Sequence, residues 1–261
     1  MIWRSLTCFS EDFLKRRDPL HNYRGSVLSA ITLSLLMTGL VPAASVAGRV
    51  MLIDSKDATV RKKGDFSGVV LWLEGPIGEP SPVPKGTRAT MAQKDKTFLP
   101  HVLAVSVGAV VDFPNFDPIF HNAFSNYDGE LFDVGLYRPG QSRSVHFTSA
   151  GVVRVFCNIH ASMSAVIAVL PTPYFDTSRR DGSFEIKNVP PGEYRLRVFH
   201  ERATIQTLNA LSRKISVGTE PITLPTISVS ESGYLVVPHM NKYGHEYQDP
   251  DDRGVYPGAR K

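Results

Sequence analysis

Glycine and proline interrupt this sequence so often that long regular elements are not expected over most of its length. The 261 residues contain 20 glycines and 19 prolines, with few long apolar periodic stretches outside the N-terminal region. Such punctuation argues against a helical bundle and favours short β-strands joined by turns. With 42% hydrophobic and 21% charged residues, the composition is that of a globular protein with room for one or two domains. We therefore predict an all-β fold and exclude disorder along the whole chain.

The N-terminal region has the layout of a secretory signal. A basic segment over residues 4–24 precedes an uncharged apolar run over residues 26–41, and small residues follow up to Ala47. We predict a signal peptide over residues 1–47, cleaved near Ala47, and a periplasmic or otherwise exported protein. The apolar run is shorter than the roughly 20 residues that span a bilayer comfortably, which argues against a retained membrane anchor. No later segment has this character, so we expect no membrane span after cleavage.

Removal of the leader has two consequences for the exported protein. The formal net charge of +4 falls, because the leader carries more basic than acidic side chains, and this weakens the electrostatic case for nucleic-acid binding. Of the two cysteines, Cys8 leaves with the leader, so Cys157 cannot form an internal disulfide. A lone thiol in an oxidising compartment is open to oxidation unless it is buried or bound to a metal.

Runs rich in β-branched and aromatic residues alternate with turn-rich segments along the rest of the chain. Residues 75–85 contain several prolines and glycines, cannot form a strand or helix interior, and are interpreted as a linker. Gly108 is expected to form the turn between two β-branched runs, and Pro190-Pro191-Gly192 the turn of a hairpin. The expected strands lie at residues 48–54 and 68–74, between 90 and 115, and at 151–156, 164–170, 183–186 and 194–199.

One short segment places three potential metal ligands close together. Cys157, His160 and Met163 supply a thiolate, an imidazole and a thioether at three-residue intervals on a connection between two expected strands. His121 is the natural fourth ligand, so the site would join two separate segments. Two imidazoles and a thiolate with a weak thioether form the blue-copper arrangement. Zinc would gain little from the thioether, and structural zinc sites usually draw on two paired clusters, of which one is present.

Simpler explanations exist for each ligand taken singly. A lone cysteine is often a small buried hydrophobe and a methionine is often core filler, but all four ligand types at these intervals favour copper. Three other histidines lie in or beside strand patterns and are expected to be ordinary sheet or surface residues: His101, His146 and His200. A polar terminal segment is favoured over a second, weaker copper site in the tail, whose ligands would be His239, Met240 and His245.

The ligand motifs resemble those of the cupredoxins, the blue copper proteins of the amicyanin and plastocyanin type, and the ligand spacing is most similar to that of amicyanin. The resemblance is carried by VDFPNFDPIFHNAF at residues 111–124 and CNIHASM at residues 157–163. It implies a Greek-key cupredoxin sandwich over residues 87–171. It also implies that Asn122 ties the two ligand segments together by hydrogen bonds, and that one copper ion, cycling between Cu(II) and Cu(I), is bound by His121, Cys157, His160 and Met163.

A second resemblance concerns the region after the ligand motifs. The stretch DGSFEIKNVPPGEYRLRVFH, residues 181–200, is similar to the carboxypeptidase regulatory-like domains, which are small transthyretin-like β-sandwiches. Residues 172–232 offer too few strands for a complete sandwich, and residues 48–78 could supply the rest. We therefore expect the copper domain to be inserted into this second domain, followed by a tail over residues 233–261. The alternative is that the early strands begin the cupredoxin. The resemblance implies no peptidase activity.

Together, these features predict an exported protein that carries single electrons between redox proteins of the cell envelope. The cupredoxin resemblance implies that electrons enter at the exposed edge of His160. A copper-handling protein without an electron-carrier role is the alternative, and a surface interaction module is a third interpretation. An oxidase or nitrite reductase would need further copper ions and a substrate pocket, so we expect no enzymatic activity. Nucleic acid is not an expected partner, and the sequence leaves the oligomeric state open.

Overall fold

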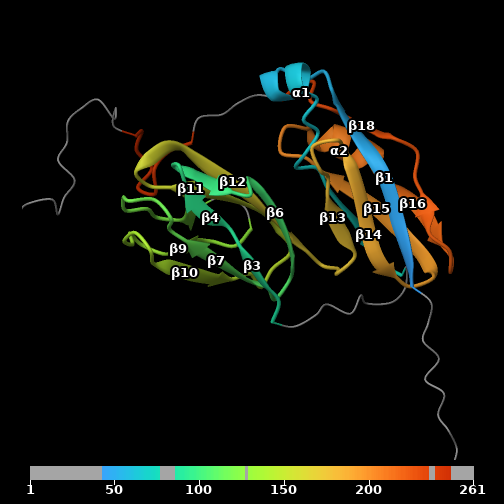
Figure 1. The fold of residues 1–261 in the computed structure, drawn as a ribbon, viewed down its shortest axis with the longest axis horizontal. Helices are drawn as coiled ribbons and strands as arrows, with labels where there is room; N and C mark the ends of the chain where they lie inside the picture. Colours follow the sequence, from blue (N-terminus) through green and yellow to red (C-terminus); the bar gives the residue numbers. More distant parts are fainter. Residues whose placement is uncertain (1–42, 77–85, 127–128, 235–238, 248–261) are drawn as a thin grey trace, which may run out of the picture. The chain divides into compact units, whose positions relative to one another are not determined.

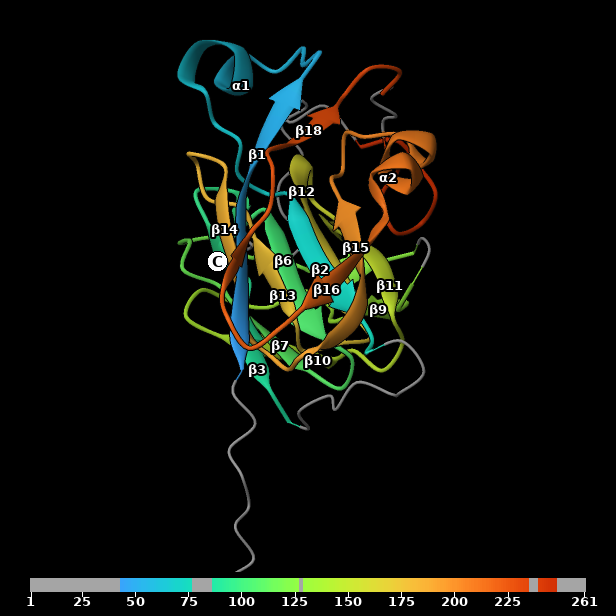
Figure 2. The same ribbon diagram turned by 90° about the vertical axis from the view of Figure 1, so that its right-hand side faces the viewer.

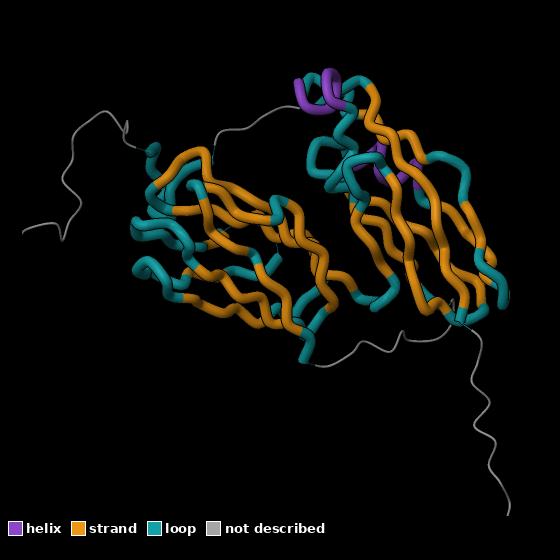
Figure 3. The backbone as a smooth tube through the Cα atoms, in the orientation of Figure 1, coloured by secondary structure: helices purple, strands orange, loops and turns teal. Residues whose placement is uncertain are grey.

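The computed structural model describes residues 43–76, 86–126, 129–234 and 239–247. Strands dominate these residues and only two short helices occur among them (Figure 3), so the all-β prediction is confirmed. The expected leader up to residue 42, most of the linker and the tail beyond Tyr247 lie outside the described residues. Among the described helices, none has the length and apolar character that crossing a membrane requires.

Two four-stranded sheets, which we call the flanking sandwich, are built from both ends of the described chain. The strand orders are β14-β1-β17, with β18 also paired to β1, and β13-β2-β15-β16. β1 runs antiparallel to β14, and β2 runs antiparallel to β15, so early strands lie beside late ones (Figures 1 and 2). The bounds are β1 Ala44–Ile53, β2 Val70–Glu74, β13 Phe175–Thr177, β14 Ser183–Val189, β15 Gly192–Phe199, β16 Arg213–Val217, β17 Ile222–Thr223 and β18 Ile227–Ser230.

Apolar side chains of both sheets meet in one buried cluster. Val46 and Ile186 come from the first sheet, Leu71 and Tyr194 from the second, and none of the four is measurably exposed. β1 begins at Ala44, earlier than predicted, and Ala44 is also buried. Cleavage near Ala47 would therefore remove core residues of the flanking sandwich.

Gly182, in the motif that precedes β14, has a structural reason to be glycine. Its φ of +80° lies in the left-handed region, and a Cβ built there would collide with the carbonyl oxygen of Val50. The amide of Val50 donates to the carbonyl oxygen of Gly182 at 2.9 Å. This glycine therefore allows β1 to approach the turn that leads into β14.

The second set of sheets, which we call the ligand domain, lies between β2 and β13 in sequence. A five-stranded sheet has the order β6-β12-β11-β8-β9, a three-stranded sheet has the order β10-β7-β3, and β4 forms a hairpin with β5. The bounds are β3 Arg88–Thr90, β4 Ala92–Lys94, β5 Thr97–Leu99, β6 Val102–Ser106, β7 Val110–Pro114, β8 Phe124–Ser125, β9 Phe132–Asp133, β10 Ser142–His146, β11 Gly151–Cys157 and β12 His160–Leu170. Its buried cluster contains Phe113, Phe147 and Ile167 and also Cys157 and Met163.

Gly108 lies in the expected turn, but the strands on either side of it belong to different sheets. β6 pairs parallel with β12, whereas β7 pairs with β10 and β3. The turn thus carries the chain from one sheet of the ligand domain to another. A pattern of β-branched runs predicts strands but does not choose their partners, which depend on residues far away in sequence.

The sequence did not predict the two helices, α1 (Ala58–Lys63) and α2 (Ile205–Leu211). Each is capped by a side-chain oxygen: Asp57 accepts from the Thr59 amide, and Thr204 accepts from the Thr207 amide. Segments of six or seven residues are too short to show a helical repeat of apolar residues, and only Val60 of α1 is buried. Local capping therefore defines these helices more than hydrophobic patterning does.

Candidate metal centre

The ligand motif forms the end of a β-hairpin. β11 ends at Cys157, β12 begins at His160, and only Asn158 and Ile159 form the turn between them. We expected strand structure to resume only at residue 164, but the pairing of the two strands continues until Cys157 faces His160. The hairpin itself therefore sets the position of these two side chains.

His121 reaches the same place from the segment that precedes β8. Its amide donates to the carbonyl oxygen of Tyr137 at 3.2 Å, and the Tyr137 amide donates back to the carbonyl oxygen of His121 at 2.9 Å. The side chain of Tyr137 is also fixed, since its hydroxyl donates to the Phe113 carbonyl oxygen at 2.8 Å. These bonds hold the backbone of His121 against that of Tyr137.

Three of the four predicted ligands meet. The sulfur of Cys157 lies 3.8 Å from Nδ1 of His121 and 3.5 Å from Nδ1 of His160. One potential ligand atom from each of the three residues lies within 4.8 Å of the other two. His121 and Cys157 are fully buried and His160 is half-buried.

Met163, the predicted fourth ligand, is fully buried in β12 and belongs to the same apolar cluster as Cys157. The structure thus keeps the thioether in the interior of the ligand domain rather than at its surface. Its role as a weak fourth ligand stays a prediction.

Burial favours the uncharged forms of the Cys157 thiol and the His160 imidazole when no metal is bound. Burial raises the pKa of the Cys157 thiol, although amides of Ile159, Asn122 and His160 partly oppose this shift. Burial, followed by the charge of His121, lowers the pKa of His160 to about 4. His160 is therefore neutral at pH 7, with a lone pair available, and a bound cation would stabilise the thiolate in place of a proton.

Asp117 orients His121. Its Oδ2 atom lies 2.7 Å from Nε2 of His121, which leaves Nδ1 of that ring directed toward Cys157. Amides of Asp95 and Lys96, at the tip of the β4–β5 hairpin, donate to the same carboxylate at 2.6 and 2.9 Å. Burial alone would raise the pKa of Asp117, but the bonds from Lys96 and His121 outweigh it and lower that pKa. The sequence alone does not predict this role; the available signal is an acidic residue four positions before a candidate ligand.

Asn122 lies between the two ligand segments and is fully buried. Its Oδ1 atom accepts from the Asn158 amide at 3.3 Å, and its Nδ2 donates to Asp133 at 2.7 Å. Asn122 is thus hydrogen-bonded to the ligand turn from a position next to His121, the link that the cupredoxin resemblance implies. That this link supports metal binding stays a prediction.

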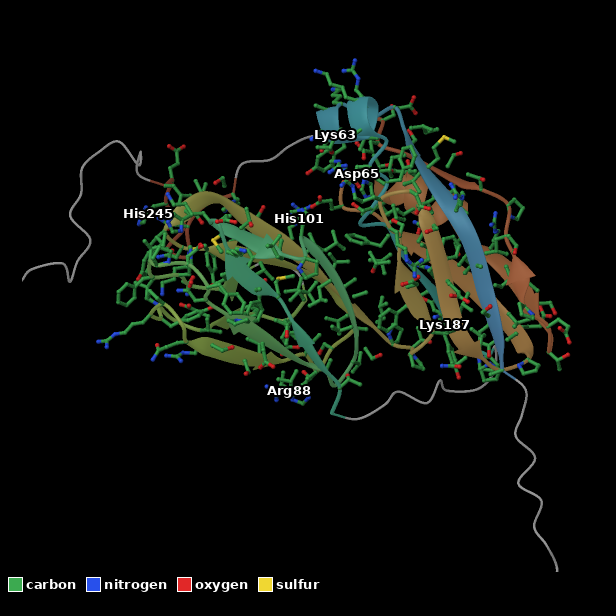
Figure 4. The ribbon with its side chains drawn as sticks, in the orientation of Figure 1. Lys63, Asp65, Arg88, His101, Lys187 and His245 are labelled. Carbon is green, nitrogen blue, oxygen red and sulfur yellow. The ribbon has the colours of Figure 1, made fainter. Side chains whose placement is uncertain are left out.

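The other candidate residues have different surroundings. Nε2 of His146 bonds to the Gly108 carbonyl oxygen, and the buried His200 pairs with Glu231. Within the described ranges, His121, Cys157 and His160 are the only grouping of three or more His, Cys, Asp or Glu side chains with ligand atoms this close together. Nε2 of His239 bonds to the carbonyl oxygen of Ala161. Residues 239–247 lie against the ligand hairpin; His245 marks this segment in Figure 4.

Comparison with solved structures finds partial similarities. A Cu-containing nitrite reductase from Thermus scotoductus SA-01 has 26% identity over 38% of this chain and 27% of its own length, with a TM-score of 0.31. A purple cupredoxin from Nitrosopumilus maritimus has 20% identity over 32% of this chain and 99% of its own, with a TM-score of 0.29. An amicyanin variant has 20% identity over 38% and 98%, with a TM-score of 0.31. No protein-family model and no curated protein sequence matches the chain.

Similarity of this extent does not transfer a function, and the matched region spans little more than a quarter of the nitrite reductase. It does correct one expectation. We expected no enzymatic activity, yet one of the similar proteins is a nitrite reductase, which is an enzyme, so that exclusion is wrong as stated. The physical reason is that one fold can serve different chemistries, so a single ligand grouping does not exclude catalysis.

Proposed function

We propose that this chain binds one copper ion through His121, Cys157 and His160, with Met163 as a weak fourth ligand, and that it transfers single electrons. The observation that carries the proposal is the meeting of two imidazoles and one thiol, from two separate segments, within 4.8 Å. This ligand set suits copper in both oxidation states, and bound copper would supply the Cu(II)/Cu(I) couple. The type 1 character of the site is part of the proposal.

The surrounding residues support this function because they hold the ligands without help from a metal. Asp117 orients the His121 ring, Tyr137 holds the His121 backbone, and strand pairing places Cys157 opposite His160. A geometry imposed by the protein changes little when the oxidation state changes, which favours electron transfer.

His160 is the proposed entry point for electrons. It is half-buried, whereas His121 and Cys157 are fully buried. A redox protein of the cell envelope could therefore approach the ligand set most closely at this imidazole.

A visible spectrum of the copper-loaded protein tests the proposal. We expect an intense thiolate-to-Cu(II) absorption, reversible one-electron voltammetry, and loss of the absorption in Cys157→Ser but not in His146→Gln. A colourless protein, or a band that survives in Cys157→Ser, would refute the site. Rapid transfer of Cu(I) to a chelator, without reversible voltammetry, would favour copper handling over electron transfer.

The domain division belongs to the same proposal: a copper domain over residues 87–171 inserted into a carboxypeptidase regulatory-like sandwich over residues 48–78 and 172–232. The pairing of β2 with β15 and of β1 with β14 supports this division, because both join strands from the two sides of the ligand domain. The glycine requirement at Gly182 agrees with the motif on which the resemblance rests.

Export to the periplasm or beyond is proposed from the leader. The burial of Ala44 and Val46 in the flanking sandwich supports cleavage before β1 rather than near Ala47. N-terminal sequencing of the exported protein tests this: we expect a mature chain that retains Ala44. A chain that begins at Gly48 would contradict the revised position.

A further inference from the structure

The C-terminal segment over residues 239–247, which we call the strap, lies against the ligand hairpin. The Tyr247 hydroxyl donates to the carbonyl oxygen of Cys157 at 2.9 Å, and Nε2 of His239 donates to the carbonyl oxygen of Ala161 at 2.8 Å. The Lys242 amide donates to Oδ1 of Asn158 at 2.9 Å. These bonds reach both strands of the hairpin and the turn between them.

Aromatic contacts fix the two ends of the strap to the same place. The His239 ring stacks on Phe156, the residue before Cys157, at 4.0 Å between ring centroids and an interplanar angle of 28°. The Tyr247 ring meets His239 edge-on at 5.2 Å, and its hydroxyl lies 3.3 Å from Nδ1 of His239. Phe156 is only 4% exposed, so it gives the strap an immobile apolar support.

A closed circuit of polar contacts joins the strap to both ligand segments. Nζ of Lys242 lies 2.7 Å from Oδ2 of Asp133, and the other oxygen of Asp133 accepts from Asn122 at 2.7 Å. Asn122 accepts from the Asn158 amide, and the Asn158 side chain accepts from the Lys242 amide. Asn122 follows His121 and Asn158 follows Cys157, so each ligand segment has a direct neighbour in the circuit.

We propose that His239, Lys242 and Tyr247 are positioning residues for the metal centre. They hold the hairpin that carries Cys157 and His160 closed against the segment of His121, and so slow the opening movement through which copper would leave. This inference rests on the proposed copper function, but the restraint on the hairpin is a property of the metal-free chain as well. Loosening the strap should therefore change the hairpin even when no metal is present.

Full-length variants that remove only these contacts test the inference: Tyr247→Phe, His239→Gln, Lys242→Ala and their combination. His245→Gln is the matched control in the strap. His245 is exposed, and the described structure gives its side chain no hydrogen bond to the ligand hairpin. Lys242→Arg should retain the contact with Asp133 and behave as the unmodified chain does.

Amide hydrogen exchange and copper release are measured for each variant, and the free energy of unfolding in urea is measured alongside them. We expect amide hydrogen exchange over residues 156–161 to be about tenfold faster in metal-free Tyr247→Phe, which loses roughly one net hydrogen bond, and faster still in the combined variant. Copper release to a chelator should also be about tenfold faster, with a shift of the visible band. The controls should match the unmodified chain in both measurements.

The inference is overturned if exchange and copper release in the combined variant equal those of the unmodified chain, or if both change only as far as a lower global stability requires. If the combined variant does not fold, Tyr247→Phe alone, which removes one hydroxyl, decides by the same criteria. If the unmodified chain gives no thiolate-to-copper band, the proposed function fails, while hydrogen exchange of the metal-free chain still tests the strap.

Discussion

Two buried histidines of this protein invite comparison. His121 is fully buried with Nε2 2.7 Å from Asp117, and His200 is 2% exposed with Nε2 2.9 Å from Glu231. Each imidazole is thus removed from water and oriented by a carboxylate. Burial and a carboxylate partner alone therefore do not distinguish His121, the proposed metal ligand, from His200.

The difference lies in what surrounds the remaining nitrogen and the carboxylate. Nδ1 of His121 faces the sulfur of Cys157, whereas Nδ1 of His200 has no hydrogen-bond partner among the described residues. Glu231 already has a cation, since Nη2 of Arg202 lies 3.0 Å from it. The two sites therefore differ in the group that faces the free nitrogen, which is a thiol only at His121, and in the cation that already occupies the carboxylate of Glu231.

Replacing each of the two imidazoles should give the largest difference in copper binding between the two variants. His121→Gln removes a proposed ligand and is expected to weaken copper binding by more than about a hundredfold, measured by competition with a chelator. His200→Gln should leave copper binding unchanged and lower the free energy of unfolding by about 1–3 kcal/mol in urea, because buried Glu231 loses a donor. Equal loss of copper in both variants would contradict the proposed assignment of His121, and not His200, as a copper ligand.

Replacing the two carboxylates, Asp117 and Glu231, should have the next largest effects: one on copper affinity and the other on stability. Asp117→Asn is expected to reduce copper affinity by about 10–100-fold, because the amide cannot fix the His121 ring in the same state. Glu231→Gln should leave copper affinity unchanged while destabilising the copper-free chain. Calorimetric copper titration measures the first effect and urea unfolding the second. Unchanged affinity in Asp117→Asn would show that the orientation of His121 does not depend on this carboxylate.

Acid should act on both regions of the copper-free protein. Burial lowers the pKa of His160 to about 4 and also lowers the pKa of His200. Because the unfolded chain binds these protons more readily, the stability they contribute is present above about pH 6.5 and is lost as the pH falls toward the folded-state pKa values. We expect the free energy of unfolding to fall between about pH 6.5 and 4, and to fall less steeply in His160→Gln and in His200→Gln. Identical slopes in all three proteins would contradict this.

The smallest effect is expected at Ser55, whose hydroxyl donates to the second oxygen of Glu231 at 2.6 Å. Ser55→Ala should lower the free energy of unfolding by about 1 kcal/mol, because Glu231 keeps its bonds to His200 and Arg202. Copper binding should not change. A loss as large as that of His200→Gln would mean that the hydroxyl, not the imidazole, is the main support of Glu231.

The sequence predicted local features of the ligand region and missed those that depend on distant partners. Cys157 and His160 are three residues apart on β-prone segments, so their meeting follows from one hairpin. The contribution of Asp117 depends on amides of the β4–β5 hairpin, whose position no local pattern reveals. The polar composition of the C-terminal region predicts a tail and does not reveal the strap. Two of the strap's bonds go to main-chain carbonyls, which leave no trace in residue spacing.

The position at which the leader ends and β1 begins could not be predicted from the sequence either. Residues 43–47 are small, and small residues suit both a cleavage site and a tightly packed strand. The sequence alone favoured the first interpretation, whereas pairing with β14 places Ala44 and Val46 in the core. Turn positions were easier to predict than strand pairing: Gly108 has a φ of +85°, in the left-handed region. The hairpin predicted around Pro190-Pro191-Gly192 does not form, because β14 and β15 belong to different sheets.

The long-range pairing of the flanking sandwich has a consequence for folding kinetics. Val70 pairs with Phe199 and Val46 with Ile186. These strands therefore cannot pair until the whole intervening chain has been synthesised. Contacts of such high sequence separation form slowly, because closing a long loop costs conformational entropy before the strand pairing can stabilise it. Prior collapse of the intervening residues would shorten the effective loop. We therefore expect the ligand domain to nucleate first, and the flanking sandwich to be the late, rate-limiting product of refolding.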